Sequence, residues 1–327
     1  MSDSRLRVLT YHRVLDPAQT TTLNASVISA TPADFTRQMR HLAAHYRVLP
    51  AEEIVDAVRA RRRLPPRAVL LTFDDGYRDF GEVAWPVLRR YRLPATLFVP
   101  THYPDQPERV FWWDHLDRAF ALTARTWISV PPLGILSLQG VAARRRSLRR
   151  VQQHLKTVPH AELTKAVRAI AGQLDDVRRT PADVLSWPEL VALSRDGVTL
   201  APHTRTHPAL TQMPEAEARA EIRGSRDDLR QRIGAVLPIF AYPFGAHDDR
   251  VIQLVREEGF ELAVTTVPGQ NRLSRIDPLQ LRRTNVGMRT GPFLFPLRLL
   301  NAFTAVDRWR QGIRRAADGE PLVRGIA

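Results

Sequence analysis

AVLLTFDDGY, at residues 68–77, is the stretch that decides the fold of this chain. Its first six residues, Ala68–Phe73, are apolar or small and predict a buried β-strand. The strand stops at Asp74 and Asp75, which are poor strand formers, and Gly76 then permits a sharp exit. Adjacent carboxylates repel each other unless a cation or a proton offsets their charge. The pair therefore indicates a functional site, and a plain Asp-Gly turn is the alternative.

A second short apolar run, Val198–Pro202, is followed by His203 and His207. Two histidines at this spacing share one face of a helical turn or close across a tight loop, and either geometry suits two imidazole ligands on one metal ion. Because the chain has ten histidines, a pair of solvated or core histidines is the alternative. Both clusters follow expected strands, so both can lie at the same end of one sheet or barrel.

A third expected strand, Pro238–Tyr242, leads into Pro243, Phe244 and Gly245. The proline forces an extended approach, and the glycine allows the backbone to turn with its amide groups pointing outward. Exposed backbone amides are the groups from which an oxyanion hole is built. An ordinary loop containing proline and glycine is the alternative.

Taken together and in this order, the three clusters resemble the polysaccharide deacetylase family, the NodB-like carbohydrate esterases. The resemblance covers roughly residues 5–290. It implies an α/β fold, a distorted (β/α) barrel of the NodB-like type, together with one divalent metal. The implied reaction is hydrolysis of an N-acyl group, with acetyl the expected one, from an amino sugar.

Residue by residue, the resemblance assigns Asp74 as the catalytic base and the backbone amide of Phe244 as the oxyanion donor. It assigns Asp75, His203 and His207 as the ligands of the metal. Two imidazoles and one carboxylate leave open coordination positions, as catalytic sites do. Because the chain has no cysteine, thiolate ligands are excluded, and Zn²⁺ is the expected metal with Co²⁺, Ni²⁺ or Mn²⁺ as alternatives.

The proton donor is not identified by this resemblance. The family often has an arginine two residues before the motif proline, where Ala241 stands here. Its late motif, whose histidine normally serves as general acid, is not recognisable. His247 is the expected replacement, because an arginine such as Arg283 is too weak an acid to donate a proton at neutral pH.

The expected substrate-binding residues are His12, Tyr77, Thr204, Tyr242, Pro243 and Arg283. By the resemblance, Thr204 also matches the small hydroxyl residue that supports the ligand loop. His12 follows the first expected strand, Leu6–Tyr11. That strand looks like the Tyr-His strand of family members that act on exported or membrane-linked amino sugars. His12 either lines the mouth of the site or caps the strand.

Apolar runs alternate with helical patterns along the chain, which favours βα units and a parallel sheet or barrel. The expected barrel covers residues 1–290 and is interrupted at about 101–186 by a helical insertion. The insertion opens with the aromatics of Phe111–His115, which form a sugar-stacking wall or pack the insertion on the barrel. Further expected strands are Ala95–Pro100, Glu261–Thr266 and Gln280–Val286. Expected helices are Pro32–His45, Ala51–Arg62, Asp79–Tyr91, Pro214–Ile233 and Asp248–Glu258.

Residues 291–327 are expected to form a basic C-terminal amphipathic helix and a tail. This helix lies in a membrane interface, or it covers the barrel or a partner subunit. The net charge of +14 would attract anionic lipid headgroups, but arginine-rich usage alone is the simpler explanation of this charge. Nucleic-acid binding is not expected, because no recognised motif accompanies the arginines.

Hydrophobic content of 44% and charged content of 25% are typical of a globular protein. The first residues lack the apolar core of a signal peptide. We therefore expect a cytoplasmic protein, with peripheral contact at the inner membrane face as the alternative.

The sequence predicts a metal-dependent carbohydrate deacetylase, a hydrolase of non-peptide C–N bonds in glycan, exopolysaccharide or glycolipid assembly. Its partner would be an N-acylated amino sugar, either polymeric, lipid-linked or nucleotide-linked. The alternative is a catalytically silent sugar-binding or scaffold protein on the same fold, which the missing acid motif permits.

Overall fold

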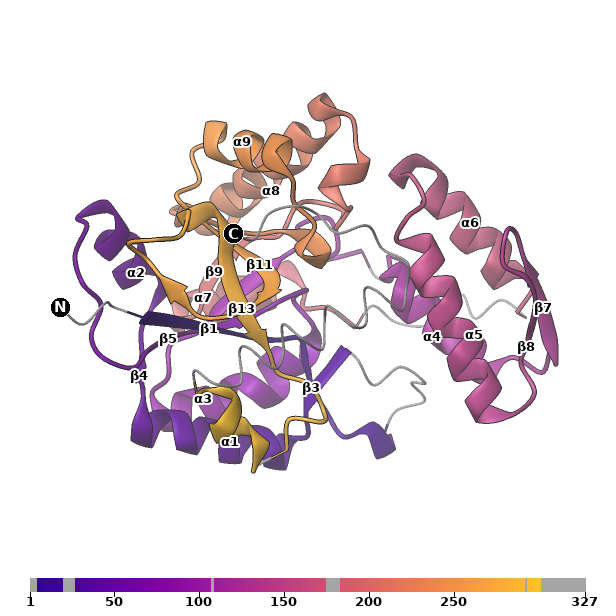
Figure 1. Cartoon of the computed structure of the whole chain (residues 1–327), viewed down its shortest axis with the longest axis horizontal. Helices are drawn as coiled ribbons and strands as arrows, with labels where there is room; N and C mark the ends of the chain where they lie inside the picture. Colours follow the sequence, from indigo (N-terminus) through magenta and orange to yellow (C-terminus); the bar gives the residue numbers. More distant parts are fainter. Residues whose placement is uncertain (1–4, 20–26, 107–108, 175–182, 292, 301–327) are drawn as a thin grey trace.

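The computed structural model describes residues 5–19, 27–106, 109–174, 183–291 and 293–300 (Figure 1). Within these residues, one nine-stranded sheet forms the centre of the molecule, in the order β10-β11-β13-β1-β5-β6-β9, with β4 beside β5 and β12 beside β1. Its strands are β1 (Arg5–Tyr11), β4 (Arg47–Val48), β5 (Ala68–Phe73), β6 (Thr96–Val99), β9 (Thr199–Pro202), β10 (Ile239–Ala241), β11 (Leu262–Pro268), β12 (Asn271–Arg272) and β13 (Leu281–Asn285).

The sheet curls into a nearly closed barrel. Its pairs are parallel, apart from the antiparallel pairing of β12 with β1. At the two ends of the sheet, Nδ1 of His203 after β9 lies 2.8 Å from the carbonyl oxygen of Ala241 in β10. The predicted distorted (β/α) barrel is therefore confirmed, and each expected strand is present with its ends shifted by at most two residues.

Helices cover the outside of the barrel, as the apolar patterns indicate (Figure 1). Thr31 caps the first of them, and its hydroxyl accepts from the N–H of Asp34. Two expectations differ in detail. Arg61 has a positive φ of 49° and ends the second helix early. The expected helix Asp79–Tyr91 begins as a π-helix at Phe80–Ala84, since Pro86 has no N–H for the α-helical ladder. The helices are α1 (Pro32–His45), α2 (Ala51–Arg59), α3 (Trp85–Tyr91), α7 (Trp187–Arg195), α8 (Glu215–Ile233) and α9 (Asp249–Glu257).

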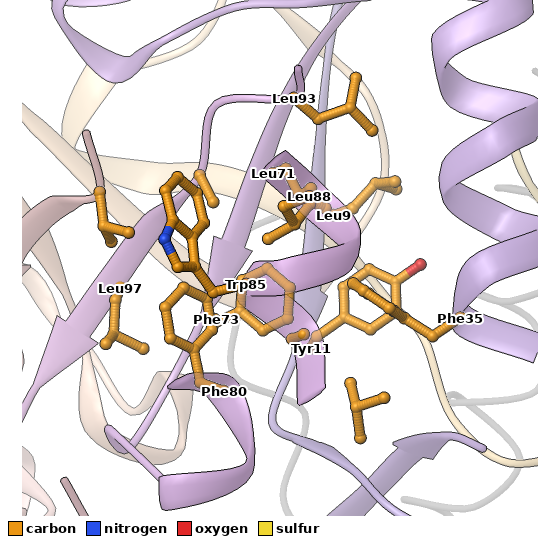
Figure 2. Packing of buried hydrophobic residues seen from close by; sticks show 14 of the residues in the cluster. Leu9, Tyr11, Phe35, Leu71, Phe73, Phe80, Trp85, Leu88, Leu93 and Leu97 are labelled. Atoms are coloured by element: carbon orange, nitrogen blue, oxygen red, sulfur yellow. The ribbon is translucent and has the colours of Figure 1, made fainter. Parts of the chain in front are cut away.

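Aromatic side chains fill the core under the ends of β1 and β5 (Figure 2). The rings of Tyr11 and Phe73, the last residues of these strands, stack at 5.3 Å. Phe35 of α1 meets Tyr11 edge-on at 5.3 Å, and Phe80 meets Phe73 at 4.8 Å. Such aromatic contacts add to the stabilisation from burial. They fix the two strand ends from which His12 and Asp74 emerge.

The insertion forms its own layer beside the barrel (Figure 1). Its helices pack around a separate apolar cluster that includes Leu116, Phe120, Leu148 and Ile170. It also contains an antiparallel hairpin that the expected helical insertion does not include. The elements are α4 (Trp112–Leu122), β7 (Trp127–Val130), β8 (Gly134–Ser137), α5 (Gly140–Leu155) and α6 (His160–Gly172).

At the C-terminal side, the described residues contain only the short helix α10 (Leu294–Arg298). Phe295 is buried, whereas Leu294 and Leu297 are exposed. The rest of the expected amphipathic helix, from residue 301, lies outside the described residues.

Two short strands, β2 (Arg13–Val14) and β3 (Ile28–Ala30), pair near the end of β1. Among the described helices, none has the length and apolar character needed to cross a bilayer.

Candidate metal and active site

The parallel strands bring three predicted ligands together at their carboxyl ends. Asp75 follows β5, and His203 and His207 follow β9. Oδ1 of Asp75 lies 3.7 Å from Nε2 of His203 and 3.3 Å from Nε2 of His207. One ligand atom of each residue lies within 4.8 Å of the others, and all three side chains are buried. Segments 128 residues apart thus converge on one small polar cluster.

The donor atoms of this cluster fit a divalent metal. Oδ1 of Asp75 and Nδ1 of His207 are buried and have no hydrogen-bond partner among the described residues. A buried polar atom without a partner is costly, and a cation bound at the cluster would satisfy the carboxylate oxygen. The carbonyl oxygen of Ala241 can only accept, so Nδ1 of His203 carries the proton and Nε2 is free to act as a ligand.

The charge states of the cluster also suit metal binding. Burial alone would raise the pKa of Asp75, but the adjacent His207, with His12 and His203, lowers it to about 2. Burial, reinforced by His207, lowers the pKa of His203 to about 4. At neutral pH the carboxylate is therefore ionised and the His203 imidazole is neutral, which are the forms that coordinate metals.

Asp74, the predicted base, lies outside the ligand set and forms an ion pair with Arg283. The guanidinium nitrogens Nη1 and Nη2 of Arg283 each donate to the Asp74 carboxylate at 2.8 Å, and Nε donates to the carbonyl of Thr265 at 2.7 Å. Burial raises the pKa of Asp74, but Arg283 and the nearby His203 and His12 outweigh it and hold this pKa below its usual value.

Arg283 thus supplies, from β13, the contact to the base that Ala241 cannot supply. The sequence predicts that Arg283 contacts the substrate, but the structure places its side chain in the interior, bound to other parts of the protein. The side chain is 1% exposed, and its three nitrogens are engaged by the protein. Arg283 is therefore a positioning residue.

His12 lies beside Asp74, at the mouth of the site. Its Nε2 is 4.0 Å from Oδ2 of Asp74, and its side chain is 26% exposed, whereas the Asp74 side chain is only 3% exposed. The backbone N–H of His12 donates to the hydroxyl of Ser29 at 2.8 Å. The imidazole of His12 is therefore more exposed to solvent than Asp74, Arg283 or any of the three predicted metal ligands.

His247, the predicted replacement acid, does not join the cluster. Its Nδ1 lies 2.7 Å from the carbonyl oxygen of Gly245, and its ring stacks on that of Tyr242 at 5.3 Å. The hydroxyl of Tyr242 donates to the carbonyl of Leu279, and the ring is fully buried in the barrel wall. The structure therefore does not support His247 as the proton donor or Tyr242 as a substrate contact.

Trp113, near the start of the insertion, contacts the predicted ligand His207, and Tyr77 holds Trp113 in place. The hydroxyl of Tyr77 donates to Asp114 at 2.9 Å and accepts from Nε1 of Trp113 at 3.0 Å. The ring of Trp113 meets that of His207 edge-on at 4.8 Å. Tyr77 is fully buried, so it also acts in support rather than in substrate contact. Trp113 shows that the aromatics of the insertion pack against a predicted ligand.

Phe244 covers another side of His207, with ring centroids 4.6 Å apart. The loop Pro243–Gly245 lies so close to β11 that a Cβ on Gly245 would be 2.1 Å from Oγ1 of Thr266. Gly245 also has a φ of 69°, so glycine is required on both counts. Pro243, at the start of the same loop, is buried. The oxyanion role of the Phe244 amide stays a prediction.

Backbone strain is concentrated at this site. Among the described residues, eight other than glycine have a positive φ, and four of them are Asp75, Thr204, His207 and Phe244, at 75°, 65°, 57° and 57°. Such conformations cost about 1–3 kcal/mol each and cluster at functional sites. The hydroxyl of Thr204 accepts from the N–H of His207 at 3.0 Å, which supports the ligand loop as the resemblance implies.

Glu221 of α8 holds the same loop from outside. Its carboxylate accepts from the backbone N–H groups of Arg205 and Thr206, at 2.7 and 2.8 Å, and from the Thr206 hydroxyl at 2.8 Å. The guanidinium of Arg205 pairs in turn with Asp228 on the same helix. Sequence reasoning missed Glu221, because nothing distinguishes it from the other charged residues of α8.

Comparison with known proteins agrees with this fold. The family model described as "Polysaccharide deacetylase" matches residues 61–263. The chain belongs to the polysaccharide deacetylase family.

Individual relatives are distant. The Bacillus subtilis protein YxkH is 18% identical over 267 residues, which are 81% of this chain and 66% of YxkH. The poly-beta-1,6-N-acetyl-D-glucosamine N-deacetylase of Escherichia coli K12 is 35% identical over 81 residues, which are 24% of this chain and 12% of that protein. The chain thus matches just under two thirds of the first relative and a small part of the second.

The fold is shared with solved structures. The Streptococcus pyogenes deacetylase PplD, solved in complex with acetate, superposes with a TM-score of 0.61 at 20% identity. The match covers 91% of this chain and 100% of PplD. At this identity the likeness shows the fold alone.

Proposed function

We propose that the chain is a metal-dependent hydrolase that removes an N-acyl group, in the simplest case acetyl, from an amino sugar of a glycan or glycolipid. One observation carries the proposal. A buried Asp75–His203–His207 cluster lies directly beside a carboxylate, Asp74, that is kept out of the cluster by its ion pair with Arg283. Membership of the deacetylase family and the relatives described above support the same reading.

The cluster would hold one divalent ion, and Zn²⁺ suits its nitrogen and oxygen donors. Such an ion, when bound, polarises a carbonyl oxygen and lowers the pKa of a bound water. The chain's own residues account for the rest. Asp74, ionised and held by Arg283, accepts the proton of the attacking water. The amide of Phe244 would donate to the oxyanion that develops.

His12 is our candidate for the proton donor to the leaving amine. It lies 4.0 Å from Asp74 and is partly exposed at the mouth of the site, where a substrate would have to enter. Imidazole can deliver a proton at neutral pH, whereas the guanidinium of Arg283 cannot. This assignment replaces His247.

The experiment is a measurement of acetate and formate released by metal-reconstituted protein from oligomeric, nucleotide-linked and lipid-linked N-acylated amino sugars. Asp74→Asn serves as the control for background hydrolysis. Release by the native chain that is absent in D74N supports the proposal. If the metal is bound and saturable sugar binding occurs without release, the catalytically silent sugar-binding alternative is correct instead.

We also propose that the protein works in the cytoplasm or at the inner membrane face, where its net charge of +14 would favour anionic headgroups. Cosedimentation with vesicles of pure phosphatidylcholine and with vesicles containing phosphatidylglycerol tests the membrane contact. Binding that requires phosphatidylglycerol and weakens with salt supports it, and equal recovery with both vesicle types contradicts it.

A further inference from the structure

The hairpin of the insertion turns an apolar, uncharged face to solvent. In its register Trp127 pairs with Ser137 and Ser129 pairs with Ile135, so these four side chains share the outer face. Trp127 and Ile135 are 58% and 74% exposed, and they are diagonal neighbours, close enough for a large side chain to span. The side chains that point inward belong to the apolar cluster of the insertion: Ile128, Val130 and Leu136.

The hairpin lies at the end of the molecule that is turned away from the barrel (Figure 1). Side chains of the insertion bond to the outer edges of both strands. Gln173, just after α6, bonds through its amide group to the backbone N–H and carbonyl of Ser129, at 3.3 and 3.1 Å. The hydroxyl of Ser147 donates to the carbonyl of Ser137 at 2.7 Å. The exposed face, rather than an open strand edge, is therefore the feature that a partner would contact.

A row of arginines on α5 borders this face. The helix has five arginines and no acidic residue. Arg146 and Arg150 line a groove of about 250 Å³ together with Ile135, and Arg145 and Arg149 are exposed on the same helix. Arg150 makes one long hydrogen bond, of 3.5 Å, to a carbonyl of the hairpin turn. In the described part of the chain, none of these four arginines forms an ion pair with an acidic side chain.

The combination of apolar and cationic side chains fits the surface of an anionic membrane. Tryptophan prefers the level of the lipid headgroups, where its ring is partly in the apolar phase and its N–H stays hydrated. Arginines near the surface are attracted to anionic lipids. The groove is several times the volume of about 30 Å³ that one water occupies, so it admits a phosphate group. A polyanion in water would satisfy the arginines but would offer no apolar phase to Ile135.

We propose that the outer face of the hairpin, with Arg146 and Arg150 beside it, docks the protein on a membrane that contains anionic lipids. The inference rests on the proposed membrane contact and names the surface that makes it. Trp127 and Ile135 enter the headgroup region while the arginines bind lipid phosphates. The same insertion contacts the predicted ligand His207 through Trp113, so it joins the docking surface to the candidate metal site.

The first test uses cosedimentation with vesicles that contain phosphatidylglycerol. Arg146→Gln combined with Arg150→Gln should weaken binding by about fivefold for each arginine, the usual contribution of one basic residue near an anionic surface. Arg62→Gln combined with Arg63→Gln is the matched control. It removes the same charge from the loop after α2, where both side chains are exposed, at the opposite end of the molecule (Figure 1). An equal loss in the two double variants would overturn the proposal.

The second test asks whether the hairpin enters the lipid. Vesicles of phosphatidylglycerol with brominated acyl chains should quench part of the tryptophan fluorescence of the native chain, and Trp127→Phe should remove that part. Trp127→Ser should weaken binding to the same vesicles about tenfold, because burial of a large apolar side chain is lost. Quenching that is the same in the native chain and in Trp127→Phe, or full affinity in Trp127→Ser, would show that charge alone acts and would overturn docking through the hairpin.

Acetate release from a water-soluble N-acetylated amino sugar separates this inference from the proposed reaction. The double variant of Arg146 and Arg150 should keep the native kcat/KM for such a substrate, because neither residue lies in the metal cluster. Vesicle binding that depends on the hairpin supports the docking surface even if no acetate is released. Acetate release by a chain that does not bind phosphatidylglycerol vesicles overturns the docking surface and leaves the proposed reaction standing.

Discussion

The guanidinium of Arg283 holds the carboxylate of Asp74 through two hydrogen bonds of 2.8 Å, across 209 residues of sequence. Arg283 lies on β13 and Asp74 directly follows β5, and these two strands flank β1. Both side chains are buried, so the pair is shielded from solvent screening and fixes the orientation of the carboxylate. Loss of either partner would leave the other charge buried and uncompensated.

The first prediction concerns the pH profile of Arg283 variants. Arg283 lowers the pKa of Asp74 while burial raises it. Arg283→Met removes the guanidinium but keeps Asp74 buried, so the pKa of Asp74 should rise. The acid limb of the pH profile of kcat/KM reports the ionisation of the catalytic base in the free enzyme, and it should therefore move to higher pH. Arg283→Lys keeps the positive charge beside Asp74, so the acid limb of kcat/KM should move less in this variant than in Arg283→Met. It loses the two-bond geometry, however, and kcat should still fall by up to about a hundredfold.

Thermal melting in parallel shows whether each Arg283 variant is folded. A folded Arg283→Met variant whose acid limb coincides with that of the native chain would contradict the role of this pair.

The second prediction separates the two adjacent aspartates. Asp75 belongs to the cluster of candidate ligands and Asp74 does not. Asp74→Asn should retain one divalent ion per chain and lose turnover by about 10²–10⁴-fold, which is the usual contribution of a general base. Asp75→Asn should lose the ion as well as the turnover. Elemental analysis of the purified variants, together with acetate release, measures both effects, and loss of metal in D74N would refute this division of roles.

The strand ends and their polar residues were predictable from the sequence. Apolar runs before Asp74 and His203 identified two parallel strands, and parallel strands place the residues after their carboxyl ends at one end of a barrel. The register of β13 was not predictable in the same way. Arg282 and Arg283 are adjacent, and only the packed structure shows that Arg283 is buried and Arg282 is partly exposed.

His247 illustrates the opposite failure. It is close in sequence to Phe244, yet the left-handed turn at Gly245 carries it onto the ring of Tyr242. Positive φ values at residues other than glycine, such as Thr204 and His207, leave no signal in a single sequence. Contacts in the folded loop maintain them, both local, as between Thr204 and His207, and distant, as with Glu221.

The third prediction concerns the support of the ligand loop by Glu221. Its carboxylate accepts two backbone N–H groups and one hydroxyl of that loop. Glu221→Ala should weaken metal binding by about 10–100-fold, as is usual for the outer partners of metal ligands. Competition with a chelator measures the affinity. Glu217→Ala, at an exposed position on the same helix, is the matched control, and equal metal affinity in the two variants would show that Glu221 has no such role.

The last prediction tests His12 as the proton donor. An amine leaving group needs a proton before it departs, whereas a nitrophenolate leaves readily without one, so the benefit of a general acid depends on the leaving group. His12→Gln should lower turnover of an N-acetylated sugar by about 10²–10⁴-fold and turnover of 4-nitrophenyl acetate much less, with the metal retained. His247→Gln, whose side chain lies on Tyr242, should leave the ratio of the two activities unchanged. If H12Q lowers both activities equally, His12 acts on binding or on Asp74 and not on the leaving group.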